Sequence, residues 1–330
     1  MTIKHSLHSQ HTLRIGLLGL GAVGTLMAGY WRDLRPVALP RNPDPLNPEN
    51  RGTNNGEKRV HLQALDGSVS ELVLPCWHGE TLDWLVVTTK AADTLNALQN
   101  WRAQLPAVRR ILLLQNGMGQ QDQVADWLAQ EGLTDRCELW AGISTEGAYR
   151  TTSGDTDNGS TERVVHAGSG ATLAGRWLAG DNDSAPLPPG IQYHADIRGP
   201  MREKLAINAV INPLTGLLRC ANGELVSNPD YRQQLEALAQ EVAGFYAAMG
   251  WPLNTPLTER AAAVASATAA NRSSTLQDIL AGRATELPWI GGYLLHCAQE
   301  SGYSLPLTRQ LLLTLDASGE PQAPASCAEH

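Results

Sequence analysis

The chain up to about residue 195 alternates between short apolar runs and segments in which apolar residues recur at a helical spacing. Glycine-rich or polar turns separate the two kinds of segment. Strands are predicted at 13–18, 36–40, 84–90, 110–116 and 138–145, and helices at 25–31, 91–105 and 120–130. Because parallel strands are joined by crossover helices, this alternation is typical of a doubly wound sheet. The pattern predicts an α/β fold.

Two further patterns in this part of the chain indicate antiparallel strands. Residues 60–65 and 69–74 flank Asp66-Gly67, which is a hairpin signal. Residues 163–166 and 171–177 are also compatible with strands, and we expect them to close the same sheet.

The pattern changes after residue 195 to long segments with helical periodicity and few glycines. Helices are predicted at 201–218, 230–249, 258–270, 275–281, 288–300 and 307–315. Asn228-Pro229 suits a helix N-cap and first turn. We therefore divide the chain into a flexible tail (1–12), a sheet domain (13–195), an all-α domain (196–315) and a second flexible tail (316–330).

Three glycines, Gly19, Gly21 and Gly24, follow the first predicted strand at the spacing GxGxxG. The first permits a sharp turn, the second lets the backbone approach a pyrophosphate, and the third allows close helix packing. The following helix offers free N–H groups and the positive end of its dipole. The positions predicted to hold a dinucleotide in this Rossmann-type domain are Gly19, Leu20, Gly21, Ala22, Val23 and Gly24. The alternative is a glycine-rich turn without a chemical role.

Other polar residues follow the later predicted strands, at the edge where such sheets bind ligands. Arg41 follows the second strand, and Lys90 and Asn116 are the last residues of the strands at 84–90 and 110–116. A guanidinium at the position of Arg41 suits a 2′-phosphate, whereas NAD-binding folds carry an acid there. The sequence therefore favours NADP(H) over NAD(H). The alternatives are that Arg41 is a solvated surface residue and Lys90 an ordinary strand-end lysine.

The first predicted helix of the second domain carries a polar stripe in an otherwise apolar sequence. Lys204, Asn208 and Asn212 are spaced four residues apart, so that they share one side of the helix. A stripe with a single charge and two amides suits a cleft better than open water. Capping or packing roles are the alternative.

Composition narrows the classes of partner. The 330 residues carry a formal net charge of −8, which argues against nucleic acid or an anionic membrane as the main partner. No apolar run approaches the ~20 residues of a membrane span, and residues 1–12 lack the apolar centre of a signal peptide. We therefore expect a cytoplasmic protein. Neither a CxxC pair nor an HxxE-type motif occurs, so no metal is expected in catalysis.

The segment KLAINAVINPLTGLLRCANGEL at 204–225 resembles the core signature of the ketopantoate reductases, or 2-dehydropantoate 2-reductases. The similarity continues in NRSSTLQD at 271–278, TE at 285–286, GLGAVG at 19–24, VTTK at 87–90 and NGMG at 116–119. The resemblance implies a helical domain like the C-terminal domain of 6-phosphogluconate dehydrogenase. It also implies NADPH-dependent reduction of ketopantoate to pantoate, on the route to pantothenate and coenzyme A, by a monomer or homodimer.

The resemblance further implies roles for individual residues. Lys204 matches the proton donor of the family, and Glu286 an acid at the junction of cofactor and active site. The positions that match substrate contacts are Asn116, Asn208, Asn212, Asn222 and Ser274. The positions that match cofactor contacts outside the glycine loop are Arg41, Lys90, Asn116, Ala148 and Glu286. Two other functions stay open: a reductase of the same fold for another 2-keto acid, and a non-catalytic NADP(H)-sensing protein.

Overall fold

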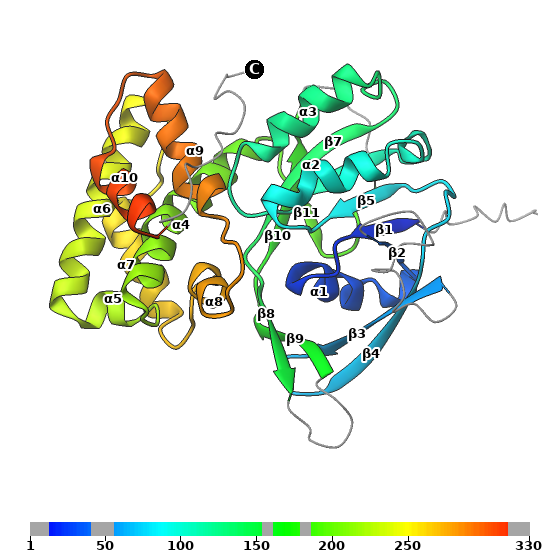
Figure 1. The fold of residues 1–330 in the computed structure, drawn as a ribbon, viewed down its shortest axis with the longest axis horizontal. Coiled ribbons are helices and arrows are strands. Elements are labelled where there is room, and N and C mark those ends of the chain that lie inside the picture. Colours follow the sequence, from blue (N-terminus) through cyan, green and yellow to red (C-terminus); the bar gives the residue numbers. More distant parts are fainter. Residues whose placement is uncertain (1–12, 41–55, 154–160, 179–185, 316–330) are drawn as a thin grey trace, which may run out of the picture.

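The computed structural model describes residues 13–40, 56–153, 161–178 and 186–315. Both predicted tails and Arg41 lie outside the described residues. A lobe built on β-sheets holds the first part of the chain, and a lobe of helices holds the second, as Figure 1 shows.

The main sheet has seven strands in the order β11-β10-β7-β6-β5-β1-β2. Its strands are β1 (Ile15–Leu18), β2 (Val37–Leu39), β5 (Trp84–Val87), β6 (Arg110–Leu113), β7 (Glu138–Ser144), β10 (Thr172–Arg176) and β11 (Ile191–Tyr193). Neighbouring strands are parallel except for β10, which runs antiparallel to β7. The predicted α/β fold with a parallel-rich sheet is confirmed.

Helices cover both faces of the main sheet, and the alternation of side chains along each strand explains why. In β1, Ile15 and Leu17 belong to the apolar cluster around α1 (Ala22–Tyr30). Leu18 points the other way, into the cluster that contains α2 (Ala91–Asn100) and α3 (Gln120–Gln130). Because both faces are covered, the central strands β1 and β5 are apolar throughout. The described residues of this lobe also include short 3-10 helices at Arg32–Leu34 and Leu105–Ala107.

A second sheet of four strands, in the order β4-β3-β9-β8, lies against α1. Its strands are β3 (Glu57–Gln63), β4 (Val69–Pro75), β8 (Gly147–Ser153) and β9 (Thr161–Gly168). The predicted hairpin is confirmed as β3 and β4. The expectation that 163–166 closes the main sheet is wrong, because β9 pairs with β3 and β8. These strands alternate apolar and polar residues, which suits a sheet covered on only one face.

The second lobe consists of helices in its described residues. They are α4 (Arg198–Leu218), α5 (Glu224–Ser227), α6 (Pro229–Ala248), α7 (Leu257–Ala267), α8 (Ser274–Leu280), α9 (Leu287–Glu300) and α10 (Pro306–Leu315). The central helix α4 contacts all six others and also β7. Asn228 caps α6 as predicted, since its side chain accepts hydrogen bonds from two backbone N–H groups. The predicted all-α character is confirmed.

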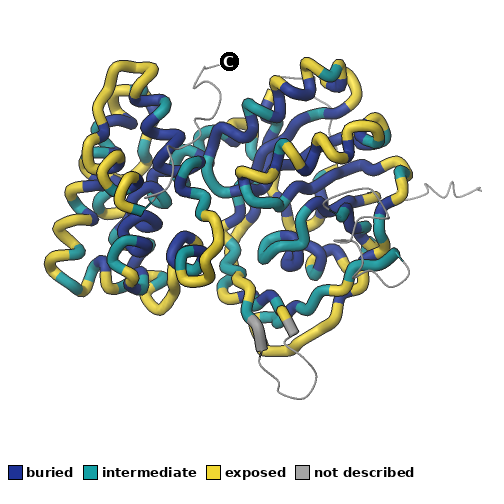
Figure 2. The backbone as a smooth tube through the Cα atoms, in the orientation of Figure 1, coloured by how far each residue is buried: buried dark blue, intermediate teal, exposed yellow. Residues whose placement is uncertain are grey.

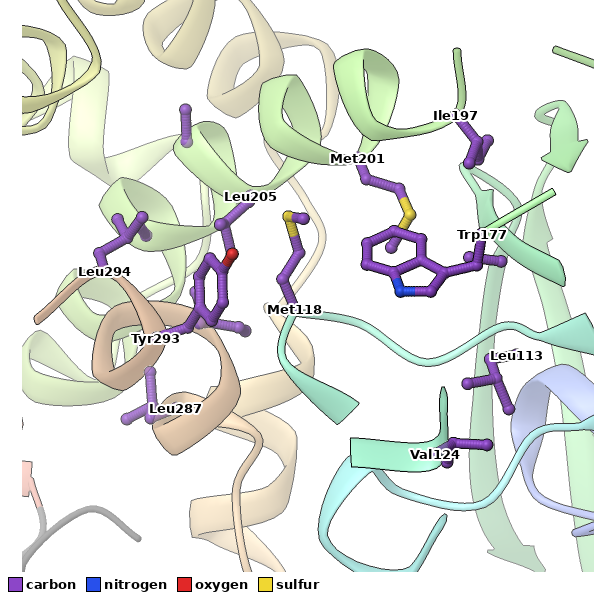
Figure 3. Packing of buried hydrophobic residues seen from close by; sticks show 14 of the residues in the cluster. Leu113, Met118, Val124, Trp177, Ile197, Met201, Leu205, Leu287, Tyr293 and Leu294 are labelled. Atoms are coloured by element: carbon purple, nitrogen blue, oxygen red, sulfur yellow. The ribbon is translucent and has the colours of Figure 1, made fainter. Parts of the chain in front are cut away.

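One apolar cluster runs from the α2–α3 face of the sheet into the helical lobe and joins the two. Met118, in the loop after β6, points towards α4 and lies between Leu205 and Met201 (Figure 3). Gly117 in the same loop has φ +82°, and a Cβ there would lie 2.3 Å from the Trp289 carbonyl oxygen. The loop therefore fits closely against α9, which begins beside the site described below. Figure 2 shows that exposed residues gather at the outer turns of both lobes.

Among the described residues, no helix has both the length and the apolar character needed to cross a bilayer.

Candidate active site

The glycine loop between β1 and α1 has a shape that leaves one side open. Gly19 has φ +100°, and a Cβ there would lie 2.6 Å from the Thr89 backbone nitrogen. A Cβ on Gly24 would lie 2.0 Å from the Gly19 carbonyl oxygen. At Gly21 the nearest such atom, the Thr88 carbonyl oxygen, is 3.8 Å away, which is an ordinary contact, so a Cβ would fit there without a clash. Two of the glycines are thus needed for packing, and the middle one keeps the approach open.

The N-terminus of α1 completes an anion site at this loop. Gly21 is the N-cap and brings no side chain to the first N–H groups of the helix. These groups and the helix dipole attract negative charge. Leu20, Ala22 and Val23 are half-buried around the opening. The loop can therefore bind a phosphate group.

Lys204, Asn116 and Glu286 form a chain of hydrogen bonds between the lobes. Lys204 on α4 donates from Nζ to Asn116 Oδ1 at 2.9 Å, and Asn116 Nδ2 donates to Glu286 Oε2 at 3.0 Å. The Ala91 N–H donates to Glu286 Oε1 at 3.3 Å, which ties the carboxylate to the start of α2. The three side chains come from α4, from the loop after β6 and from the N-cap of α9. The structure thus brings together the two residues predicted to be catalytic.

Lys204 has a second acceptor, the Ser144 carbonyl oxygen at the end of β7, at 2.7 Å. Both recorded partners of Nζ accept hydrogen bonds, so they suit the ammonium form, which has three N–H groups. One N–H is left to donate to a ligand. The arrangement can therefore present a proton to an oxygen atom.

Burial changes the pKa of both charged groups in this row of hydrogen bonds, Lys204 and Glu286. It lowers the pKa of Lys204 from 10.5 to about 8, and attraction to Glu286 partly offsets the fall. Burial also raises the pKa of Glu286 above its usual value, while the hydrogen bonds from Asn116 and Ala91 act in the opposite direction. A lysine pKa near neutral pH suits a group that donates a proton during turnover.

Lys90, predicted as a cofactor contact, joins the two lobes. Its ammonium forms an ion pair with Asp278 of α8 at 2.8 Å and donates to the Ala284 carbonyl oxygen. Asp278 also pairs with Arg283 at 2.9 Å. The side chain of Lys90 is 35% exposed, so a ligand can still reach it from solvent.

The other predicted site residues form no hydrogen bonds with Lys204, Asn116 or Glu286 in the described part of the structure. Asn208 is half-buried and Asn212 buried on α4. Asn222 donates from Nδ2 to Thr268 Oγ1 at 2.9 Å, while its Oδ1 is buried with no partner among the described atoms. Ser274 is exposed in the first turn of α8. The neighbouring Ser273 is the buried cap of that helix.

Ala148 lies on β8, half-buried beside the cluster that includes Leu20 and Val23. β8 contacts α1, the helix that follows the glycine loop. Arg41, the residue on which the choice between NADP(H) and NAD(H) was based, falls outside the described residues.

Two contacts of the candidate site were not predicted from the sequence. The Ser144 carbonyl is a backbone group, so no residue type marks it. Asp278 is the last residue of the segment 271–278, which resembles the family. A carboxylate there could have been predicted as a partner for a lysine. In the described residues, no cluster of three or more His, Cys, Asp or Glu side chains is arranged to hold a metal.

Comparison with known proteins decides the family. The model of the ketopantoate reductase PanE/ApbA family matches residues 15–178, and the model of its C-terminal region matches 196–318. A 2-dehydropantoate 2-reductase of Shigella flexneri is 33% identical over 263 residues, which cover 76% of this chain and 80% of the relative. The chain belongs to the ketopantoate reductase family. A 2-dehydropantoate 2-reductase of Yersinia pestis is 32% identical and covers 91% of this chain and 93% of its own length.

Solved structures agree with this family assignment. The crystal structure of a probable 2-dehydropantoate 2-reductase from Bacillus subtilis has a TM-score of 0.68 at 29% identity, and covers 92% of this chain and 99% of its own. The structure of a D-mandelate dehydrogenase with NADH and anilino(oxo)acetate has a TM-score of 0.72 at 17% identity. It covers 92% of this chain and 98% of its own. This second likeness concerns the fold alone. The chain is thus an oxidoreductase of the ketopantoate reductase family.

Proposed function

We propose that this protein reduces 2-dehydropantoate to pantoate, with NADPH as the reductant and Lys204 as the proton donor. The observation that carries the proposal is the chain from Lys204 through Asn116 to Glu286, which lies at the carboxyl edge of a dinucleotide-type sheet. The names of the relatives favour the same substrate. The product would enter the route to pantothenate and coenzyme A, in the cytoplasm.

The residues of the glycine loop fit a dinucleotide. Gly21 leaves room for a pyrophosphate where Gly19 and Gly24 leave none, and the first turn of α1 supplies uncapped N–H groups. When bound, the reduced nicotinamide supplies a hydride to the ketone carbon. We propose that the loop, Ala148 and Lys90 hold this group, and that Asn116 and Glu286 border it.

The chemistry of the protein side follows from Lys204. Negative charge grows on the ketone oxygen as the carbon is reduced, and an ammonium beside it stabilises that charge and then gives up its proton. Asn116 and the Ser144 carbonyl hold the ammonium in place. Glu286 keeps the pKa of Lys204 from falling further. These groups therefore favour a protonated lysine before reduction, whereas burial, which lowers the pKa of Lys204, makes its proton easier to lose during reduction.

We propose that Asn208, Asn212, Asn222 and Ser274 contact the substrate. Amide and hydroxyl groups orient a carboxylate or a hydroxyl without adding charge. The buried and unpartnered Oδ1 of Asn222 is an acceptor suited to a substrate hydroxyl. A monomer or a homodimer stays our prediction for the assembly.

The test is NADPH oxidation, followed by absorbance, with 2-dehydropantoate and with a panel of other 2-keto acids. NADH replaces NADPH in a parallel series. We expect 2-dehydropantoate to give the highest kcat/KM, and NADPH to be preferred.

Other outcomes would each overturn a stated part of the proposal. Faster reduction of a different keto acid would make the protein a reductase of the same fold with another substrate. Preference for NADH would refute the NADPH assignment. Tight NADPH binding without turnover of any acid would indicate a cofactor-sensing protein.

A further inference from the structure

We propose that Arg150 of β8 binds a phosphate group of the dinucleotide cofactor, an inference that rests on the cofactor binding proposed above. Arg150 donates from Nη2 to the Leu20 carbonyl oxygen at 2.7 Å. Leu20 lies between Gly19 and Gly21, in the loop that leaves room for a pyrophosphate. The guanidinium is therefore in direct contact with the phosphate-binding loop, although 130 residues separate them in the chain.

The strand geometry supports this placement. Side chains two residues apart in a strand point to the same face, so Arg150 shares its face of β8 with Ala148. Arg150 pairs across the sheet with Val164, which packs in the cluster around α1. Ala148 belongs to the margin of the same cluster. This face of the second sheet thus turns towards α1 and its N-terminus.

The charge and exposure of Arg150 suit a ligand contact. Its side chain is 42% exposed, so an anion can reach it from solvent. Nη1 pairs with Glu162 at 3.1 Å, and Nη2 with Leu20. A guanidinium has five N–H groups, so donors remain for a phosphate oxygen.

A purely structural role for Arg150 makes a different prediction. In that case the contact with Leu20 would only fix the loop, and a neutral donor would serve as well as a charged one. Arg150→Gln separates the two roles, because glutamine keeps an N–H donor near the Leu20 carbonyl and removes the charge. Charge-assisted hydrogen bonds to phosphate are stronger than neutral ones.

The experiment measures Kd for NADPH and NADH by quenching of protein fluorescence, in the wild-type protein and in Arg150→Gln. We expect Arg150→Gln to raise Kd about tenfold to a hundredfold, with Tm unchanged. A rise for NADPH alone would assign Arg150 to the 2′-phosphate. An equal rise for both cofactors would assign it to the pyrophosphate.

Two further variants serve as controls. Arg59→Gln removes the same charge from β3, on the face turned away from α1, where Arg59 pairs with Glu71 at 3.1 Å. We expect it to leave Kd unchanged. Glu162→Gln removes the carboxylate that competes with a phosphate for the guanidinium of Arg150. We expect Kd for NADPH and NADH to fall or stay the same in this variant.

Results against the inference are distinct from results against the function. If the wild-type protein binds NADPH and Arg150→Gln changes neither Kd by more than about twofold, the assignment of Arg150 is refuted and cofactor binding stands. An equal loss in Arg59→Gln would also refute it, because a general charge effect would then explain the loss. If the wild-type protein binds neither cofactor, both proposals fail.

Discussion

Replacing Lys204 with methionine should make the protein more stable at neutral pH, although it removes the proposed proton donor. The pKa of Lys204 is lowered from 10.5 to about 8 in the folded protein, because burial disfavours the charged form. At 1.36 kcal/mol per pKa unit, keeping this lysine charged costs the folded state about 3 kcal/mol at pH 7. Methionine has a similar length and no charge. The loss of hydrogen bonds to Asn116 and Ser144 offsets about 1–2 kcal/mol of the gain.

The sign of the pH dependence follows from linkage. Below pH 8 Lys204 is protonated in both the folded and the unfolded protein, so the full cost of burying its charge is present. Between pH 8 and 10.5 the folded protein loses the proton before the unfolded chain does, and the stability of the wild-type protein rises relative to that of the variant. We expect Lys204→Met to be more stable by about 1–2 kcal/mol at pH 7, and this difference to fall by about 2 kcal/mol at pH 9.5.

The assay is unfolding in urea, followed by tryptophan fluorescence, with both proteins at pH 7 and pH 9.5. Taking the difference in the free energy of unfolding between the two proteins at each pH cancels the titration of groups that do not interact with Lys204. A variant less stable than the wild type at pH 7, or a difference that does not change with pH, would refute the lowered pKa of Lys204.

Two further predictions concern the site. We expect kcat for ketone reduction to fall above about pH 8 as Lys204 loses its proton. Asn116→Asp should move this decline to higher pH, because it places a carboxylate beside the ammonium. A decline at the same pH in this variant would contradict the contact between Lys204 and Asn116. Gly24→Ala should lower the free energy of unfolding by about 1–3 kcal/mol in urea unfolding and weaken NADPH binding, because its Cβ would overlap the Gly19 carbonyl. Gly168→Ala is the matched control, since no atom lies within 4 Å of its Cβ, and equal effects in both variants would refute the steric argument.

The elements with strong periodicity were predictable from the sequence. The strand, glycine loop and helix from Ile15 to Tyr30 and the long helix α4 follow directly from apolar spacing. The second sheet was not predicted, because alternation shows that one face of β9 is buried but does not identify the partner strand. The position of β9 is decided by packing of α1 against the hairpin β3–β4, which is a tertiary contact.

The sequence predicted which residues of the candidate site would be important, but not which hydrogen bonds would connect them. Lys204, Asn116 and Glu286 come from three distant segments, and only the fit of α9 against the loop after β6 brings them together. The Ser144 carbonyl and the contact of Arg150 with Leu20 depend on backbone positions that carry no sequence signal.

The most direct test of the central claim is the rate of hydride transfer in Lys204→Ala, measured in a single turnover with NADPH and 2-dehydropantoate. Removing a general acid costs about a hundredfold to ten-thousandfold in rate. We predict a loss in this range with Kd for NADPH within about threefold of the wild-type value, because the role proposed for Lys204 is contact with the substrate oxygen and not with the dinucleotide. A rate within about tenfold of the wild type would contradict the role of Lys204 as proton donor.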